Sequence, residues 1–151
     1  MRRYRLRLAA AAIGLLAFAT LPALAGDQSA AEYIRSFYPP DNPNAPEARY
    51  TSRTAELWNQ CFKRANANGD ACMDFDMFVQ GNDFNLSDVT AEQISGDAKQ
   101  AVVRAQFKNF GKDETVIFNL IHDDQGWMID EITSGCNKLT ELLQDKSTCM
   151  N

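Results

Sequence analysis

Hydrophobic and polar residues alternate most regularly between Ala101 and Ile132. The apolar positions of the first two segments of this run are Val103, Ala105, Phe107, Val116, Phe118 and Leu120. A period of two is typical of β-strands with one buried face. Turn-forming residues at 110–113 and 123–126 divide the run into three segments. The pattern therefore predicts three successive antiparallel strands.

Pairing these strands through the two turns predicts which residues share a row. The turn at 110–113 places Val103 opposite Leu120, and the turn at 123–126 places Leu120 opposite Ile129. The same registers predict a second buried row of Ala101, His122 and Trp127. We expect Phe118 and Trp127 to line the hollow side of a curved sheet, where a ligand would bind.

The same registers align Arg104, Asn119 and Asp130 across the outer face. Arg104 and Asp130 are therefore candidates for a polar ligand clamp. The alternative is an exposed network of cross-strand contacts, which would contribute about 1 kcal/mol at most.

Other segments predict the helices that cover the sheet. Ser29 and Glu32 form the sequence pattern of a capping box, which predicts a helix from about Ala30 to Tyr38. A second helix follows Thr51 or Ser52, and Asn66–Gly69 ends it. We expect a first strand at about 85–95 and a short C-terminal helix after the three strands. The predicted class is α+β, with a curved four-stranded antiparallel meander packed against N-terminal helices.

The first 25 residues have the composition of a signal peptide. A basic start, Met1–Arg7, precedes an Ala- and Leu-rich stretch, and Ala23–Ala25 matches a cleavage site. We expect cleavage before Gly26, a single domain over 26–151, and a periplasmic or secreted bacterial location. No Cys follows the cleavage site, which argues against a lipid anchor; an uncleaved anchor is the alternative.

Charge restricts the partners. Residues 1–25 contain four Arg and no acid, so their removal changes the formal net charge from −5 to −9. Seven acids and no Lys or Arg occur within 65–98. A strongly acidic domain repels phosphate backbones and anionic membrane surfaces. We therefore expect a small-molecule or protein partner, no nucleic acid and no membrane association after cleavage.

The four cysteines predict two disulfides, because an even number in an exported chain is typical of paired thiols. Three connectivities are possible. The pairs closest in sequence, Cys61–Cys72 and Cys136–Cys149, are the ones we expect. A zinc site is disfavoured because no C-x-x-C pair occurs.

Asp74, Asp76 and Asp83 form a cluster of carboxylates that a hard cation such as Ca²⁺ would accept. The upstream residues do not complete an EF-hand, because Ala71 and Met77 occupy positions that require Gly and Glu. Capping of turns is the favoured role for these aspartates, and no cofactor is expected.

Glu131 and His122 are the candidates for acid–base chemistry. Strict alternation from Trp127 points Glu131 into the sheet's hollow side, where burial would adapt a carboxyl for proton transfer. Ile132 competes for the same interior. We favour a bulge at Asp130–Glu131, which brings Ile132 in and turns Glu131 out. His122 is expected at an exposed turn, with an acid–base pair to Glu131 as the alternative.

Four short patterns resemble one protein family. They are Asp74-Phe-Asp-x-Phe, Asp83-Phe-x-Leu, Val103-x-x-x-Phe-x-Asn-Phe-Gly and Gly126-Trp-x-Ile-Asp-Glu-Ile. Together they resemble the bacterial exported family called domain of unknown function 3828, over roughly 31–143. The resemblance implies a cone-shaped fold similar to nuclear transport factor 2 and the cystatins. It implies no activity and no catalytic residue. Met77 and Phe84 replace the usual Pro and Trp, and the cysteines are additional.

Three functions follow as hypotheses. The favoured one is a non-catalytic periplasmic module that binds a small molecule or a protein. The second is an enzyme that uses Glu131 with His122 as acid and base. The third is an envelope inhibitor or immunity-type protein whose acidic segment 65–98 covers a basic enzyme.

Overall fold

The computed structural model describes residues 28–38 and 47–146. The predicted signal peptide and Cys149 lie outside these residues, so the cleavage site and the Cys136–Cys149 pair stay predictions. None of the helices in the described ranges combines the length and hydrophobicity that crossing a bilayer requires.

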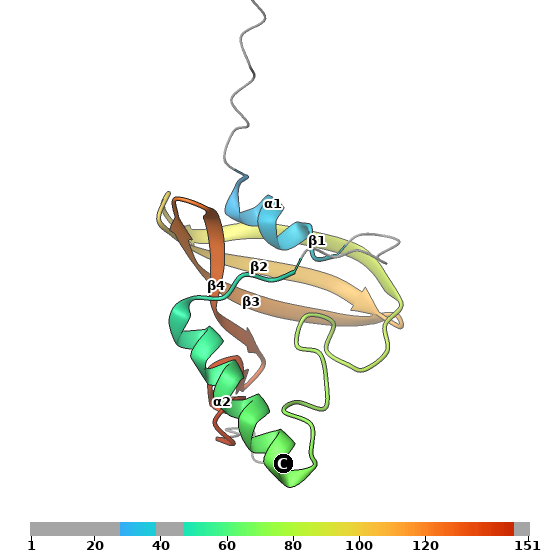
Figure 1. The fold of residues 1–151 in the computed structure, drawn as a ribbon. Coiled ribbons are helices and arrows are strands. Elements are labelled where there is room, and N and C mark those ends of the chain that lie inside the picture. Colours follow the sequence, from blue (N-terminus) through green and yellow to red (C-terminus); the bar gives the residue numbers. More distant parts are fainter. Residues whose placement is uncertain (1–27, 39–46, 147–151) are drawn as a thin grey trace, which may run out of the picture.

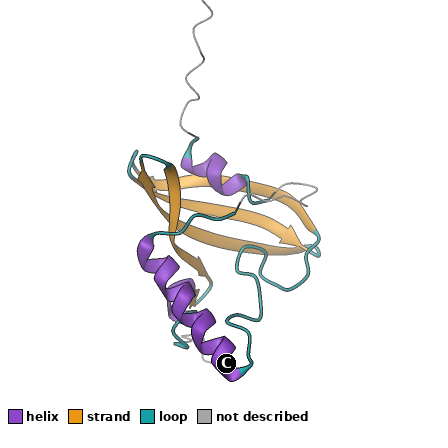
Figure 2. Ribbon diagram, viewed as in Figure 1, coloured by secondary structure: helices purple, strands orange, loops and turns teal. Residues whose placement is uncertain are grey.

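One antiparallel sheet organises the fold, and its strands follow one another in sequence order. The strands are β1 (Leu86–Gly96), β2 (Gln100–Asn109), β3 (Lys112–Asp123), β4 (Gly126–Ser134) and β5 (Asn137–Lys138). Figure 2 shows them as one curved layer with helices on one side and beyond one end. The predicted α+β class and the meander are confirmed, and the two-residue β5 extends the expected four strands to five.

Helix α1 (Ala30–Arg35) covers the hollow face of the sheet over β1 and β2 (Figure 1). Its predicted capping box is present, because the Ser29 hydroxyl accepts from the Glu32 N–H while the Glu32 carboxylate accepts from the Ser29 N–H. Ile34 is fully buried, and Tyr38 follows it into the core. The helix therefore fills the space beneath the strands.

The register between β2 and β3 differs from the prediction. Ala101 pairs with Leu120, and Val103 pairs with Phe118. The reason is the turn, in which Phe110 and Gly111 have φ of 49° and 80° and form a two-residue loop. Positive φ at both positions is the conformation of a type I′ hairpin turn. The sequence predicted the turn at 110–113, whereas the observed loop consists of Phe110 and Gly111 between the paired residues Asn109 and Lys112. The pairing moves by two residues, so each face keeps its hydrophobic set.

The register between β3 and β4 follows the prediction as far as Leu120 opposite Ile129. A bulge then places Glu131 opposite Asn119 and Ile132 opposite Phe118. The predicted bulge at Asp130–Glu131 is thus confirmed, and Ile132 is 1% exposed. Strand β4 turns away from β1–β3 at this end of the sheet (Figure 1).

A second group of elements gathers around the turned end of β4. Helix α2 (Ser52–Asn68) begins at the Thr51 cap and ends at Gly69 in the left-handed region, as the sequence predicts. The chain before it runs beside β4, since the Thr51 N–H donates to the Ile129 carbonyl at 3.0 Å. Helix α3 (Leu139–Leu142) follows β5. The predicted Cys61–Cys72 disulfide ties the chain after α2 back onto that helix.

Candidate functional site

A pocket of about 230 Å³ lies between α2, the chain after it and the end of β4. We call it the aromatic pocket. Its lining residues are mostly apolar and come from five parts of the chain: Tyr50, Trp58, Met73, Phe75, Asp76, Met77, Phe78, Ile132 and Leu139. Such a space, apolar with few polar groups, has the character of a small-molecule site.

Tyr50 and Trp58 form one corner of the aromatic pocket. Their ring centroids lie 6.2 Å apart with an interplanar angle of 55°. Burial raises the pKa of Tyr50 to about 12, the charge of Asp76 adds to the rise, and the neighbouring Trp58 indole opposes it. The indole N–H is buried, yet its geometry falls short of a hydrogen bond to any described residue. Tyr50 therefore stays neutral at physiological pH.

The opposite wall is the segment 73–78, and its shape depends on Asp76. The Asp76 Oδ1 atom accepts from the Phe78 N–H at 2.7 Å, and the Asp76 backbone exchanges two hydrogen bonds of 3.2 Å with Gly81. An aspartate that bonds the N–H two residues on stabilises a turn. This local turn, together with the Cys61–Cys72 bond, positions the wall against α2.

Phe78 connects this wall to the core. Its ring lies 5.3 Å from Phe118 and 5.2 Å from Phe37, and its carbonyl accepts from the Tyr38 hydroxyl at 2.8 Å. Burial, and to a smaller extent the charge of Asp76, raises the pKa of Tyr38 well above its usual value. The floor of the aromatic pocket is therefore anchored, whereas Asp76 at the rim is exposed.

Phe118 and Trp127 do not line an open hollow, contrary to the expectation from the sequence. Phe118 is fully buried and Trp127 is 7% exposed, because α1 and the residues after it occupy the hollow side of the sheet. The Trp127 indole N–H donates to the Gln28 carbonyl at 2.9 Å. These two side chains belong to the packed core.

The predicted clamp of Arg104 and Asp130 is also wrong. Arg104 pairs with Ile117 in the sheet and forms an ion pair of 2.7 Å with Glu92 on β1. Asp130 accepts from Arg53 at 2.9 Å and from the Thr51 hydroxyl at 2.7 Å, so it fastens the start of α2. The shifted register of β2 separates the two residues that the sequence aligned.

Glu131 does not turn to solvent, contrary to the favoured expectation. It is 8% exposed, and its carboxylate accepts from the Ile132 N–H at 3.1 Å, from the Thr140 N–H at 3.0 Å and from the Thr140 hydroxyl. The chain after β4 folds back through β5 and brings Thr140 over it. This carboxylate is satisfied by its own neighbours and secures the chain reversal.

His122 lies opposite Trp127 as predicted, and the rings meet edge to face at 4.7 Å. Glu131 pairs with Asn119, three residues from His122 on the same strand. An odd separation places the two on opposite faces of the sheet, about 10 Å apart along the strand. The acid–base pair that the sequence offered is not assembled.

The three aspartates are not gathered around one point. Within the described part of the chain, no group of three or more His, Cys, Asp or Glu side chains is placed to hold a metal ion. Asp76 caps a turn, which is the role that the sequence favoured. Asp74 and Asp83 are exposed on the same segment.

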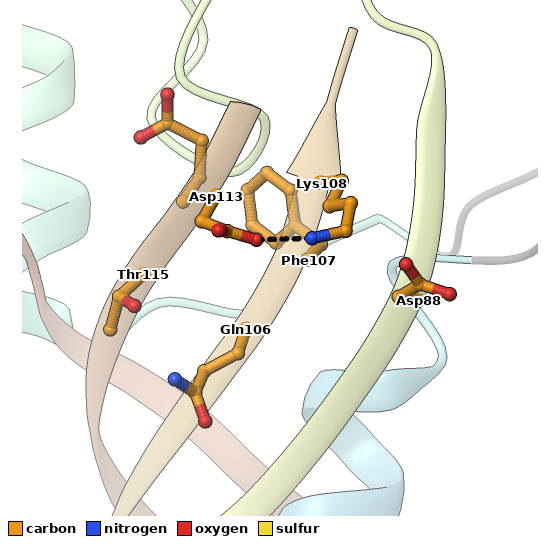
Figure 3. A pocket seen from close by; sticks show the side chains of 7 residues that line it. Asp88, Gln106, Phe107, Lys108, Asp113 and Thr115 are labelled. Atoms are coloured by element: carbon orange, nitrogen blue, oxygen red, sulfur yellow. Dashed lines mark hydrogen bonds and ion pairs between the residues drawn. The ribbon is translucent and has the colours of Figure 1, made fainter. Parts of the chain in front are cut away.

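A second hollow of about 220 Å³ lies on the outer side of the sheet near the β2–β3 turn. Figure 3 shows Lys108 and Asp113 pointing toward each other there, with Gln106 and Thr115 beside them. The Lys108 ammonium lies 2.6 Å from the Asp113 carboxylate, whose hydrogen bond raises the pKa of Lys108. Its central charges already pair with each other, so we regard the aromatic pocket as the stronger candidate.

The sequence reasoning missed Tyr50, Trp58 and Met73. Trp58 falls within the second predicted helix, where its spacing alone does not indicate a ligand site, and Tyr50 lies in no periodic element. The one available signal was the mixture of acids and aromatics in 74–84, which has no regular period. The aromatic side chains of such an irregular segment are buried only by packing against another element, which here is α2.

No known protein family and no curated protein matches this chain. Among solved structures, it is similar to a phospholipid-binding protein from Ralstonia solanacearum in complex with a phospholipid, with a TM-score of 0.36 and 14% identity. The match covers 76% of this chain and 60% of that protein. The chain thus spans less than two thirds of that protein's length, and similarity at this level supports no conclusion about a ligand.

Proposed function

We propose that this protein is an exported, non-catalytic module that binds a small and largely apolar ligand in the aromatic pocket. The observation that carries the proposal is that one hollow of the protein is filled by side chains and the other is open. The hollow side of the sheet is packed by α1, whereas four aromatic rings surround open space beside α2. Apolar side chains that line open space lose packing contacts, which a ligand would restore.

The size of the aromatic pocket limits the ligand. Its volume of about 230 Å³ falls below the roughly 300–1,000 Å³ of sites for drug-sized molecules. A compact molecule, or one end of a longer one, matches this space.

The absence of an assembled acid–base pair supports binding over catalysis. Glu131 is occupied by Thr140 and Ile132, and His122 lies on the other face of the strand. Among the described residues that line the aromatic pocket, Asp76 is the one acid, and none is a Lys, Arg or His.

Export is supported by residues 1–25 and by the disulfide. Cys61 and Cys72 are bonded, and disulfides persist mainly in oxidising compartments such as the periplasm.

The proposal is tested by nuclear magnetic resonance on the chain from Gly26 onward, labelled with ¹⁵N. The two tryptophans give two indole signals, of which Trp58 lines the aromatic pocket and Trp127 serves as an internal control. We expect members of a panel of small neutral, cationic and anionic apolar molecules to shift the Trp58 signal at millimolar concentration or below. The Trp127 signal should stay in place.

A matched pair of variants localises the effect. Phe75→Ser removes a lining ring, whereas Phe84→Ser removes an aromatic ring that is 54% exposed and lies outside the lining. Only Phe75→Ser should weaken the response of Trp58. If no panel member shifts Trp58 in the folded protein, the proposed function fails.

A further inference from the structure

We infer that the ligand of the aromatic pocket carries an organic cation, of the alkylated or quaternary ammonium class. This inference rests on the proposed function, because it names the ligand class of the same pocket. It combines the aromatic walls, the charge of Asp76 among the described lining residues and the hydrogen bonds that the Phe78 and Met77 carbonyls already accept.

The aromatic walls favour a cation. Tyr50, Trp58, Phe75 and Phe78 contribute four rings to one pocket. The faces of aromatic rings are negative, so several rings around one space attract a positive charge, most strongly when the group has little water to lose. The tilted pair of Tyr50 and Trp58 provides two adjoining walls for such a group.

The charge of the lining residues also favours a cationic ligand. Asp76 contributes a carboxylate at the rim, and none of the described residues that line the pocket is a Lys, Arg or His. Its Oδ1 atom holds the turn, whereas Oδ2 has no hydrogen-bond or ion-pair partner among the described residues. The influence of this charge on the pKa of Tyr50 shows that the field of Asp76 reaches the aromatic walls.

Asp76 Oδ2 offers one free carboxylate oxygen, which cannot satisfy all the donors of a primary ammonium, so the pocket favours an alkylated ammonium. A primary ammonium has three N–H donors to satisfy. The Phe78 carbonyl already accepts from Tyr38, and the Met77 carbonyl accepts from Gln80. A quaternary ammonium has no N–H donor, and its methyl groups can contact the rings directly.

The test compares choline with its neutral carbon isostere, 3,3-dimethylbutan-1-ol, on the same ¹⁵N-labelled chain. The two probes have nearly the same shape and differ in charge. We expect choline to shift the Trp58 indole signal with an affinity about tenfold or more above that of the alcohol. Tetramethylammonium should behave as choline does, and sodium chloride should weaken the binding because Asp76 is exposed.

Asp76→Asn and Asp74→Asn form the matched variants. Asn keeps an oxygen that can accept from the Phe78 N–H, so Asp76→Asn removes the charge without removing the turn bond. It should reduce the preference for choline over the alcohol to the part that the aromatic rings provide. Asp74→Asn removes an exposed charge of the same segment that does not line the pocket, and should leave the preference intact.

The outcomes separate the two claims. Equal binding of choline and the alcohol, or binding of other panel members only, overturns the inference and leaves the proposed function standing. A preference for choline that is undiminished in Asp76→Asn overturns the role of this carboxylate. No response of Trp58 to any probe overturns both claims.

Discussion

The two halves of this protein bury their aromatic residues in different ways. In the α1 half, made of α1 and strands β1–β3, regular elements interdigitate, and Ile34, Val103 and Phe118 are fully buried. In the α2 half, made of α2, residues 69–85, α3 and the turned end of β4, Tyr50, Trp58 and Phe75 are only partly buried around open space.

The difference shows how packing and binding are divided within one domain. A helix on a sheet brings periodic faces together and fills the interior to high density. An irregular segment has no period to match, so it is held at a few points, here the Cys61–Cys72 bond and the Asp76 turn. The space left between those points is the aromatic pocket.

Phe78 is the residue that joins the halves. Its side chain lines the aromatic pocket and packs against Phe118 beneath the sheet. The α1 half therefore supports the floor of the pocket, while its own residues contribute nothing to the rim. Loss of stability and loss of binding should be separable by mutation.

The largest effect is expected in the α1 half. Ile34→Ala removes a fully buried side chain and should lower the free energy of unfolding by about 2–5 kcal/mol, because the cavity cannot be refilled. Urea denaturation followed by circular dichroism measures the change. Ile94→Ala, at a side chain that is 44% exposed, is the control and should cost much less. If folded Ile34→Ala protein no longer binds the probes, stability and binding are not separable between the two halves.

A smaller loss of stability and a larger loss of binding are expected in the α2 half. The double variant Cys61→Ala/Cys72→Ala frees residues 69–85 and should lower the free energy of unfolding by about 2–3 kcal/mol in the chain-entropy model. The Trp58 response should be lost, because Met73 and Phe75 lie within three residues after Cys72 and line the pocket. Retention of full affinity would show that the turn at Asp76 alone positions the wall.

The smallest effect is a dependence on alkaline pH. The pKa of Tyr50 is raised to about 12, and that of Tyr38 is also raised, mainly by burial. Above the ordinary tyrosine pKa of about 10, the unfolded chain loses these protons while the folded protein keeps them, so stability falls as pH rises toward the folded pKa values. Below that range, both states keep the protons and these groups cause no pH dependence.

Tyr50→Phe tests this dependence in the α2 half. The variant has no phenol at position 50, so its stability should fall less steeply than the parent's in urea titrations between pH about 9 and about 11. Tyr38→Phe should also flatten the curve, but it loses the hydrogen bond to the Phe78 carbonyl and costs about 1 kcal/mol at neutral pH. Identical slopes in parent and Tyr50→Phe protein would place Tyr50 in solvent.

Much of the α1 half could be predicted because its signals are local. The capping box at Ser29 and Glu32 predicts the start of α1, and period-two alternation predicts β2 to β4. The conflict between Glu131 and Ile132 predicts the bulge correctly. The burial of Glu131 could not be predicted, because it depends on the return of the chain through β5 to Thr140.

The residues that the sequence offered as a ligand site differ from those that line the aromatic pocket, for a similar reason. The clamp of Arg104 and Asp130 failed because Phe110 adopts a positive φ, which a bulky residue seldom does. The position at Phe118 and Trp127 failed because alternation shows which side chains face the interior, but it does not show that α1 fills that interior.

By itself, the sequence determined the α+β class, the caps of α1 and α2 and the place of the bulge, because each depends on residues close together in the chain. It favoured the Cys61–Cys72 pair among three connectivities, and the structure decided for it. Only the tertiary structure decided the β2–β3 register, the partners of Glu131 and the aromatic pocket. The residues that line the pocket lie between Tyr50 and Leu139 in the sequence. Contacts between residues so far apart depend on how whole elements pack, and the local periodicity of the sequence does not predict them.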